Sequence, residues 1–190
     1  MLRYLIGLIL LINITVTFAA NPKDLALLAK LKNASTKPLD LSNADLKNYQ
    51  FVPGKIDLKN ANLSGADLTN ANLETMDLTN ANLTKANLTN AQLKSAILSN
   101  ANLSHANLTN ATLTQADLSN AILDYATMVN ALLEQVNLAK ADLTCANLNN
   151  ANLTKANVSE ANISGATFTN TITTDISNYE SVVDNRVECK

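Results

Sequence analysis

The chain of 190 residues is poor in the residues that usually build bulky cores and sharp loops. It has no tryptophan, three phenylalanines, four glycines and three prolines. Large aromatic rings therefore cannot dominate its core. One histidine and two cysteines exclude a His- or Cys-rich metal centre. A formal net charge of −2 gives no strong field for nucleic acid or an anionic membrane.

What the chain does have is a five-residue repeat over residues 56–170. These residues form 23 consecutive units without an insertion, with Ala at the first position in 20 units and Leu at the third in 19. The second position is mostly Asn or Asp, and the fourth is mostly Ser or Thr. A short regular period of this kind predicts a solenoid. The four other third-position residues are also apolar: Met128, Val158, Ile163 and Phe168.

A period of five fits neither a helix nor a straight strand. On an α-helix the Leu row would drift around the axis, so no buried face would form. In a straight strand an odd period would send successive Leu side chains to opposite faces. The pattern works if each unit is extended for three residues and then bends. The Ala and Leu side chains then point inward, and the other side chains point outward or form the corners.

The units Ala61–Gly65, Ala66–Asn70 and Ala81–Lys85 read ANLSG, ADLTN and ANLTK. They match the consensus A-(D/N)-L-x-x, and the array resembles the pentapeptide-repeat family over 115 of the 190 residues. The resemblance implies an all-β fold, a right-handed quadrilateral parallel β-helix with four units in each 20-residue coil. The spacing gives independent support, because the non-Ala first positions Ile56, Met76 and Val136 are separated by multiples of 20 residues.

Residues 1–19 are interpreted as a signal peptide. Arg3 is followed by an apolar run from Leu5 to Val16, and the small residues Thr17 and Ala19 precede a cleavage position. The run is short for a membrane span, although a retained anchor is the alternative. We therefore expect an exported protein, periplasmic or secreted, with no membrane span after cleavage.

Residues 20–38 are predicted to form a short N-terminal capping helix. Asp24 is a suitable N-cap, Leu25, Leu28 and Leu31 share one helical face, and Pro38 ends the helix. A solenoid needs such a cover because an open coil end exposes unpaired backbone and apolar side chains.

The repeat domain is predicted over residues 39–170. It starts with three units at residues 39–53, and Gly54 and Lys55 are two extra residues that shift the register. Residues 171–190 are expected to be a C-terminal cap or tail. Ile176, Tyr179, Val183 and Val187 have helical spacing, but their β-branched content makes a strand or a loose tail an equal alternative.

Asn recurs at every second corner of the predicted coil. Asn tolerates the left-handed backbone that tight corners need, and its amide can bond to the Asn one coil away. We expect two Asn ladders on opposite corners. One comprises Asn60, Asn80, Asn100 and Asn120, and the other comprises Asn70, Asn90, Asn110, Asn130 and Asn150.

The corner between the two ladders is variable and carries the reactive groups. Lys85, His105 and Tyr125 should lie one above the other as a surface strip, for which the alternatives are a binding function and ordinary solvated surface. Cys145 follows in the same column. In an exported protein it could pair with Cys189 in a disulfide that ties the tail to the coil; two free thiols are the alternative.

The sequence contains no catalytic, cofactor-binding or metal-binding constellation, and an interior filled by Ala and Leu leaves no room for a substrate. We therefore predict a non-enzymatic scaffold or protein-interaction module with an unknown macromolecular partner, in the first place a protein. No direct nucleic-acid binding is expected, and dimerisation is an open possibility. The resemblance adds one alternative, a DNA mimic that inhibits or protects DNA gyrase. A column of Thr69, Thr89 and Thr109 adds a second, an ice-binding surface.

Overall fold

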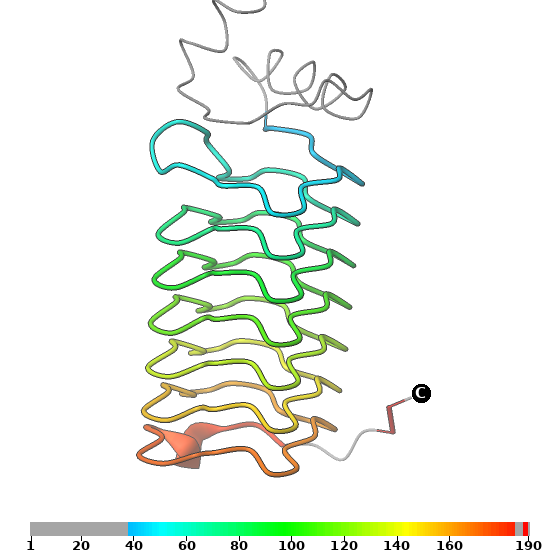
Figure 1. Ribbon diagram of the computed structural model, residues 1–190. Coiled ribbons are helices and arrows are strands. Elements are labelled where there is room, and N and C mark those ends of the chain that lie inside the picture. The colour runs from blue at the N-terminus through cyan, green and yellow to red at the C-terminus, as the bar shows by residue number, and fades with distance from the viewer. Residues whose placement is uncertain (1–37, 185–187, 190) are drawn as a thin grey trace, which may run out of the picture.

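The structure is a computed structural model that describes residues 38–184, 188 and 189. Figure 1 shows a stack of similar coils wound about one axis, with the chain advancing from one end of the stack to the other. Parallel bridges join residues 20 positions apart, as between Asn62 and Asn82 and between Asn82 and Asn102. This spacing confirms that four five-residue units make one coil.

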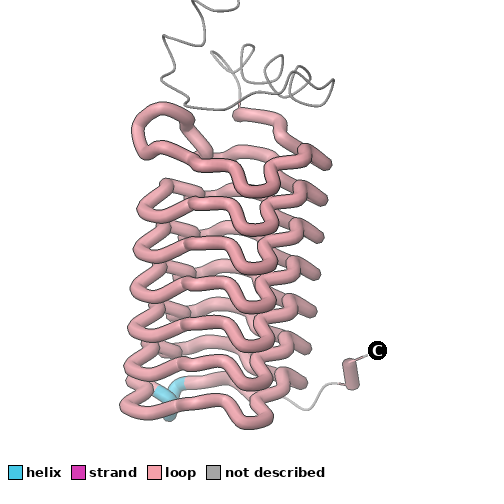
Figure 2. Tube along the Cα trace, viewed as in Figure 1, coloured by secondary structure: helices cyan, strands magenta, loops and turns pink. Residues whose placement is uncertain are grey.

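The coils are held together by single-residue bridges, so Figure 2 shows almost the whole described chain as loop. Each second-position residue pairs upward and downward. Asn82, for example, bridges to Asn62 and to Asn102. Its own N–H and carbonyl bond to Ala61 and Leu63 of the preceding coil at 2.8 and 2.7 Å. The flanking Ala81 carbonyl and Leu83 N–H bond to Asn102 of the next coil at 2.9 and 2.6 Å. Every coil therefore forms a parallel ladder with both neighbours although no strand exceeds one residue.

The core is a column of Ala and Leu side chains inside the coils. Ala81, Leu83 and Leu103 have no exposed surface, and nearly all their equivalents are as deeply buried. The first and third residues of each unit point inward because they flank the extended second residue. The predicted inward orientation is confirmed.

Each corner is a tight turn with one left-handed residue. The N–H of the next unit's first residue bonds back to the third-position carbonyl, as from Ala61 to Leu58 at 3.0 Å. The fifth residue, third in the turn, has positive φ, as in a type II turn. This holds for Asn70 (φ 56°) and also for Lys85 (59°) and Tyr125 (55°), although a left-handed backbone is unfavourable for ordinary side chains.

The two extra residues near the N-terminal end are absorbed at one corner. Asp40 pairs with Asn62, a separation of 22 rather than 20 residues. The backbone between them makes a wider turn, in which the N–H of Lys55 bonds to the carbonyl of Val52 at 3.0 Å. Figure 1 shows this loop standing out from the first coil in cyan. The shift of register predicted at Gly54 and Lys55 is thus local.

At the other end the coil continues past Asn170, beyond the boundary expected from the repeat. Ser177 pairs with Asn157, and Val183 pairs with Asn162. The reason is that pairing uses backbone groups, so it survives the loss of Leu at the third position. The only helix among the described residues is the 3-10 helix η1 (Tyr179–Ser181). Ile176 packs against the core rather than starting a helix.

The predicted signal peptide (1–19), nearly all of the predicted capping helix (20–38) and Val187 lie outside the described residues. Within the part that is described, no helix is long and apolar enough to cross a membrane.

Candidate functional site

The variable corner brings together the three residues that the sequence placed in a surface strip. Lys85, His105 and Tyr125, called the corner strip below, occupy the same corner of consecutive coils because the backbone of each corner bonds to the coil beneath. The imidazole of His105 stacks on the phenol ring of Tyr125, with ring centroids 5.0 Å apart and planes inclined by 12°. Ile122, in the same unit as Tyr125, is 41% exposed. The strip is a partly apolar surface with one cation at its end.

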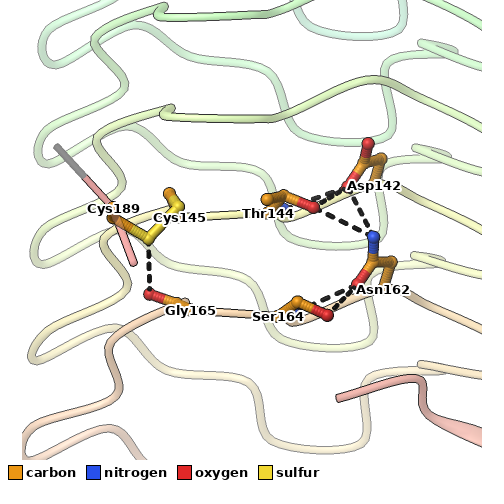
Figure 3. The surroundings of a disulfide bond; sticks show 7 residues. All are labelled: Asp142, Thr144, Cys145, Asn162, Ser164, Gly165 and Cys189. Carbon is orange, nitrogen blue, oxygen red and sulfur yellow. Dashed lines mark hydrogen bonds between the residues drawn. A yellow bond between two sulfur atoms is a disulfide. The ribbon is translucent and has the colours of Figure 1, made fainter. Parts of the chain in front are cut away.

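A disulfide closes the corner strip on the C-terminal side. Cys145 is the next residue in the column. It is bonded to Cys189, which lies 44 positions later in the sequence, and the two Cα atoms are 5.6 Å apart. Figure 3 shows the Cys189 sulfur beside the carbonyl oxygen of Gly165, one coil further on; the distance is 3.4 Å. The tail therefore crosses the last coil and is tied to the coil above it.

Toward the N-terminal side, Gly65 occupies the next corner of the column, and Asn43 occupies the corner before it. Gly65 has φ +65°, and a Cβ at this position would collide with the side-chain oxygen of Asn43. The strip therefore starts one coil later, at Lys85, where the corner first carries a long side chain.

The polar side chains on the outside of the units form regular hydrogen bonds that the sequence pattern does not predict. The Oδ1 atom of the second residue accepts the backbone N–H of the fourth, and in many units also its hydroxyl. Asn87 accepts the N–H of Thr89 at 3.2 Å and its hydroxyl at 2.6 Å. Figure 3 shows the same arrangement for Asp142 with Thr144 and for Asn162 with Ser164. The alternation of Asn/Asp with Ser/Thr is visible in the sequence, but it does not by itself indicate these bonds.

Along the side that carries Thr69, Thr89 and Thr109, these bonds join into one chain. The Asn87 amide donates to the Thr69 hydroxyl at 2.9 Å, and the Asn107 amide donates to Thr89 at 3.0 Å. Each of the three hydroxyls also donates its proton to the second residue of its own unit. The hydroxyl protons that an ice-binding surface would present to water are thus already used, which weakens that alternative.

Two carboxylates on the outside have lowered pKa values. Burial on its own would raise the pKa of Asp67, but hydrogen bonds from Thr69 and the ammonium group of Lys47, 3.1 Å away, outweigh it. For Asp77 the hydrogen bonds from Thr79 are the main cause, with a smaller contribution from Lys59. Both carboxylates are therefore more stable in their charged form in the folded chain.

These lowered pKa values predict acid sensitivity. Because the folded-state pKa of Asp67 lies below the unfolded value, its contribution to stability is present above that value and is lost as the pH falls through the folded pKa. We expect the free energy of unfolding to decline below about pH 4, and Asp67→Asn to show a smaller decline. Urea unfolding at a series of pH values measures this. A decline as steep as in the wild type would contradict the assignment to Asp67.

Of the two predicted Asn ladders, the one that contains Asn70 and Asn90 is bonded through several coils. The Nδ2 atoms of Asn90, Asn110 and Asn130 donate to the preceding Asn at 3.1, 3.2 and 3.0 Å, and Asn70 donates to Asn48 at 3.0 Å. Asn170 donates to Asn150 at 3.2 Å. In the other ladder (Asn60, Asn80, Asn100 and Asn120), the described amides form one such bond, from Asn80 to Asn60 at 3.0 Å.

Substitution of Asn110 separates the two roles of a corner Asn. Asn110→Gly keeps the left-handed backbone (φ 58°) but removes the bonds to Asn90 and Asn130. We expect a loss of about 1–2 kcal/mol in the free energy of unfolding. Asn110→Ala should lose up to about 1 kcal/mol more, because Ala disfavours this backbone. Chemical denaturation of both variants tests this; equal stability of the two would show that the corner backbone costs Ala nothing.

The described residues form no assembled metal centre. Over the described residues no group of three or more His, Cys, Asp or Glu side chains could hold a metal ion. A hollow lies at the C-terminal end of the coil, and apolar side chains line most of it. The corner strip is therefore the candidate functional site, as a contact surface rather than a reaction centre.

Both the sequence and the fold are similar to those of known proteins. The sequence matches the family of pentapeptide repeats, with eight copies over residues 56–94, 96–135 and 131–170. A comparison with curated proteins finds no match.

Several solved structures are similar. Rfr23 from the cyanobacterium Cyanothece 51142 is 35% identical over 50% of this chain and 64% of its own, with a TM-score of 0.48. This chain thus spans less than two thirds of Rfr23. HetL from Nostoc sp. PCC 7120, a protein involved in heterocyst differentiation regulation, is 29% identical over 74% of this chain and 81% of its own, with a TM-score of 0.43. The plasmid-mediated fluoroquinolone resistance protein QnrB1 is 18% identical over 75% and 79%, with a TM-score of 0.51.

Proposed function

Because the chain belongs to the pentapeptide-repeat family, whose members form right-handed quadrilateral β-helices, we propose that it is a non-enzymatic, exported scaffold that binds a protein partner through its side. The interior supports this, since it is filled by Ala and Leu side chains and leaves the outer surface as the place where specificity can reside. The rigid ladder of coils holds outward side chains at fixed spacing, which lowers the entropy lost on binding.

The main support for the proposal is the exposed apolar surface formed by the corner strip and the neighbouring Ile122. Tyr125 is 38% exposed and Ile122 is 41% exposed, whereas the units above and below them present mainly Asn, Asp, Ser and Thr. Tyr is enriched at protein contacts because it combines a large apolar ring with a polar tip. The stacked His105 restrains the Tyr125 ring, so little rotamer freedom remains to be lost.

Site-specific photo-crosslinking tests this surface in the native cell envelope. A photoreactive residue at position 125 should capture a defined partner. The same photoreactive residue at position 135 should not capture a partner. Gln135 is a suitable control because it is also a corner residue with a left-handed backbone (φ 57°), and its side chain is exposed, as is that of Tyr125. We expect His105→Ala and Ile122→Asn, introduced beside the crosslinker, to weaken capture. Equal capture from positions 125 and 135, or none from either, would refute the corner strip as the contact.

The second candidate function is a DNA mimic that acts on gyrase, and it has weaker support. The likeness to QnrB1, at 18% identity, shows the fold alone. Residues 56–170 carry nine acidic and five basic side chains, a net charge of 5 − 9 = −4, which is a dilute field for imitating DNA. A supercoiling assay with purified protein discriminates, because potent inhibition or protection of gyrase would favour this candidate over the scaffold.

Export is part of the proposal and rests on residues 1–19. Cell fractionation, with the N-terminal residue of the exported form read by mass spectrometry, tests it. A chain that begins at Ala20 and lies outside the cytoplasm supports the proposal, whereas an uncleaved cytoplasmic chain contradicts it.

A further inference from the structure

The C-terminal end of the coil is an open apolar surface. A cavity of about 500 Å³ lies there, lined mainly by the inward side chains of the last coils. Tyr179, one of the lining residues, is 63% exposed, and Ile172 and Val183 of the same last coil are 50% and 43% exposed. Apolar surface gathered in one place on a soluble protein indicates a contact site. The lining includes Leu153, Val158, Ile163, Phe168, Ile176 and Val182.

Part of the backbone at this end has no backbone partner among the described residues. In the preceding coil the N–H groups of Leu148 and Asn150 bond to carbonyls of the last coil at 2.9 and 2.8 Å. The corresponding N–H groups of Phe168 and Asn170 find no backbone acceptor within the described chain. An exposed ladder edge of this kind favours addition of another segment.

The last turn of the coil is acidic. Residues 161–184 contain Asp175, Glu180 and Asp184 and no Lys or Arg, whereas Glu160 is paired with Lys140 at 3.8 Å. Asp175 lines the cavity itself, and Glu180 lies in η1. Two copies that met through this end would bring like charges together, which is unfavourable. The occupant that fits is one that carries both apolar and cationic side chains.

Residues 20–37 of the same sequence have this composition. They contain four lysines and one acidic residue, Asp24, a net charge of 4 − 1 = +3. Lys23, Lys30 and Lys37 recur every seven residues, so on the predicted helix they share one side, next to Ala26. Long lysine stems can cover apolar surface while their ammonium groups reach the acidic side chains of the last turn.

We infer that the C-terminal end of one copy binds the segment 20–37 of a second copy, head to tail. The N-terminal segment of one copy cannot readily reach the C-terminal end of the same copy. Its segment joins the coil at Pro38, at the opposite end of a rod about 30 Å long, and the helix predicted for its 18 residues would span only about 27 Å. After two copies bind head to tail, one C-terminal end and one N-terminal segment remain free. Further copies can therefore add, and association does not stop at a dimer. This contact is independent of the partner proposed for the corner strip.

Sedimentation velocity of the chain without its predicted signal peptide tests the inference. We expect the weight-average sedimentation coefficient to rise with protein concentration without a plateau at low salt, and to fall at high salt because the contact is charged. A chain that is monomeric at every concentration, or a closed dimer unaffected by salt, would overturn the inference.

Charge reversal identifies the two ends. The variant Asp175→Lys/Glu180→Lys and the variant Lys23→Glu/Lys30→Glu should each weaken association about tenfold or more. The chain that carries all four substitutions should recover it, because attraction is restored with the signs exchanged. The matched control is Glu74→Lys, an exposed residue on the side of the coil, which should associate like the wild type. Loss in both reversed variants without recovery in the combined one would exclude this pairing of ends.

Discussion

Leu103→Asp should abolish the folded array. Leu103 has no exposed surface and lies in the centre of the Leu column. Truncating such a residue to Ala would already cost about 2–5 kcal/mol, and a carboxylate placed there has no cation to pair with. Because each coil supports only its neighbours, loss of one coil separates the array into two short halves. Circular dichroism and size-exclusion chromatography should show an unfolded or aggregated chain.

Asn102→Asp is the matched control, one residue away on the outside. The Oδ1 atom of Asn102 accepts the backbone N–H of Ser104 at 2.9 Å, and Asp retains this acceptor. We expect a change within about 0.5 kcal/mol in the free energy of unfolding. Equal tolerance at positions 102 and 103 would contradict the assignment of inward and outward side chains.

Removal of the Cys145–Cys189 disulfide should release the C-terminal coils and leave the middle of the rod intact. A cross-link between residues 44 positions apart contributes about 4 kcal/mol in the chain-entropy description. Since stability in a solenoid is local, we expect the loss to fall on residues 161–183. Hydrogen exchange before and after reduction should show faster exchange there and little change over residues 81–120.

The double variant Cys145→Ser/Cys189→Ser supplies the control for reduction. It should reproduce the fast exchange of the C-terminal coils and should not respond to reductant. If the reduced wild type and the double variant both exchange as slowly as the oxidised protein, the disulfide is not what holds the tail on the coil.

The sequence predicted the features that depend on the repeat itself. Leu83 and Ala81 are buried because a period of five with apolar first and third positions permits no other regular packing. Prediction of the 20-residue coil depended on the family resemblance, because the single column formed by Ile56, Met76 and Val136 only suggested a coil with four sides. The structure pairs the two residues named for a possible disulfide, Cys145 and Cys189, although spacing in the sequence could not decide between a bond and free thiols.

The features that the sequence could not supply depend on directions of side chains and on backbone pairing. The bonds from Thr89 to Asn87 were missed because a polar, outward pair is equally typical of plain solvated surface. The end of the repeat at Asn170 suggested that the coil stops there, but the backbone continues to pair as far as Val183. The ring stack of His105 on Tyr125 follows from the alignment of corners, which is a property of the folded coil.

The pairing of each residue with the one 20 positions later constrains how such a gene can lengthen. Duplication of a stretch encoding a whole turn of the coil would extend the rod and leave every existing column in line. Duplication of a single unit would rotate everything after it by a quarter turn, so that His105 and Tyr125, for example, would no longer share a corner if the new unit fell between them. Tolerated length variants of this protein should therefore differ by 20 residues, or carry their odd residues in a side loop as at Gly54 and Lys55.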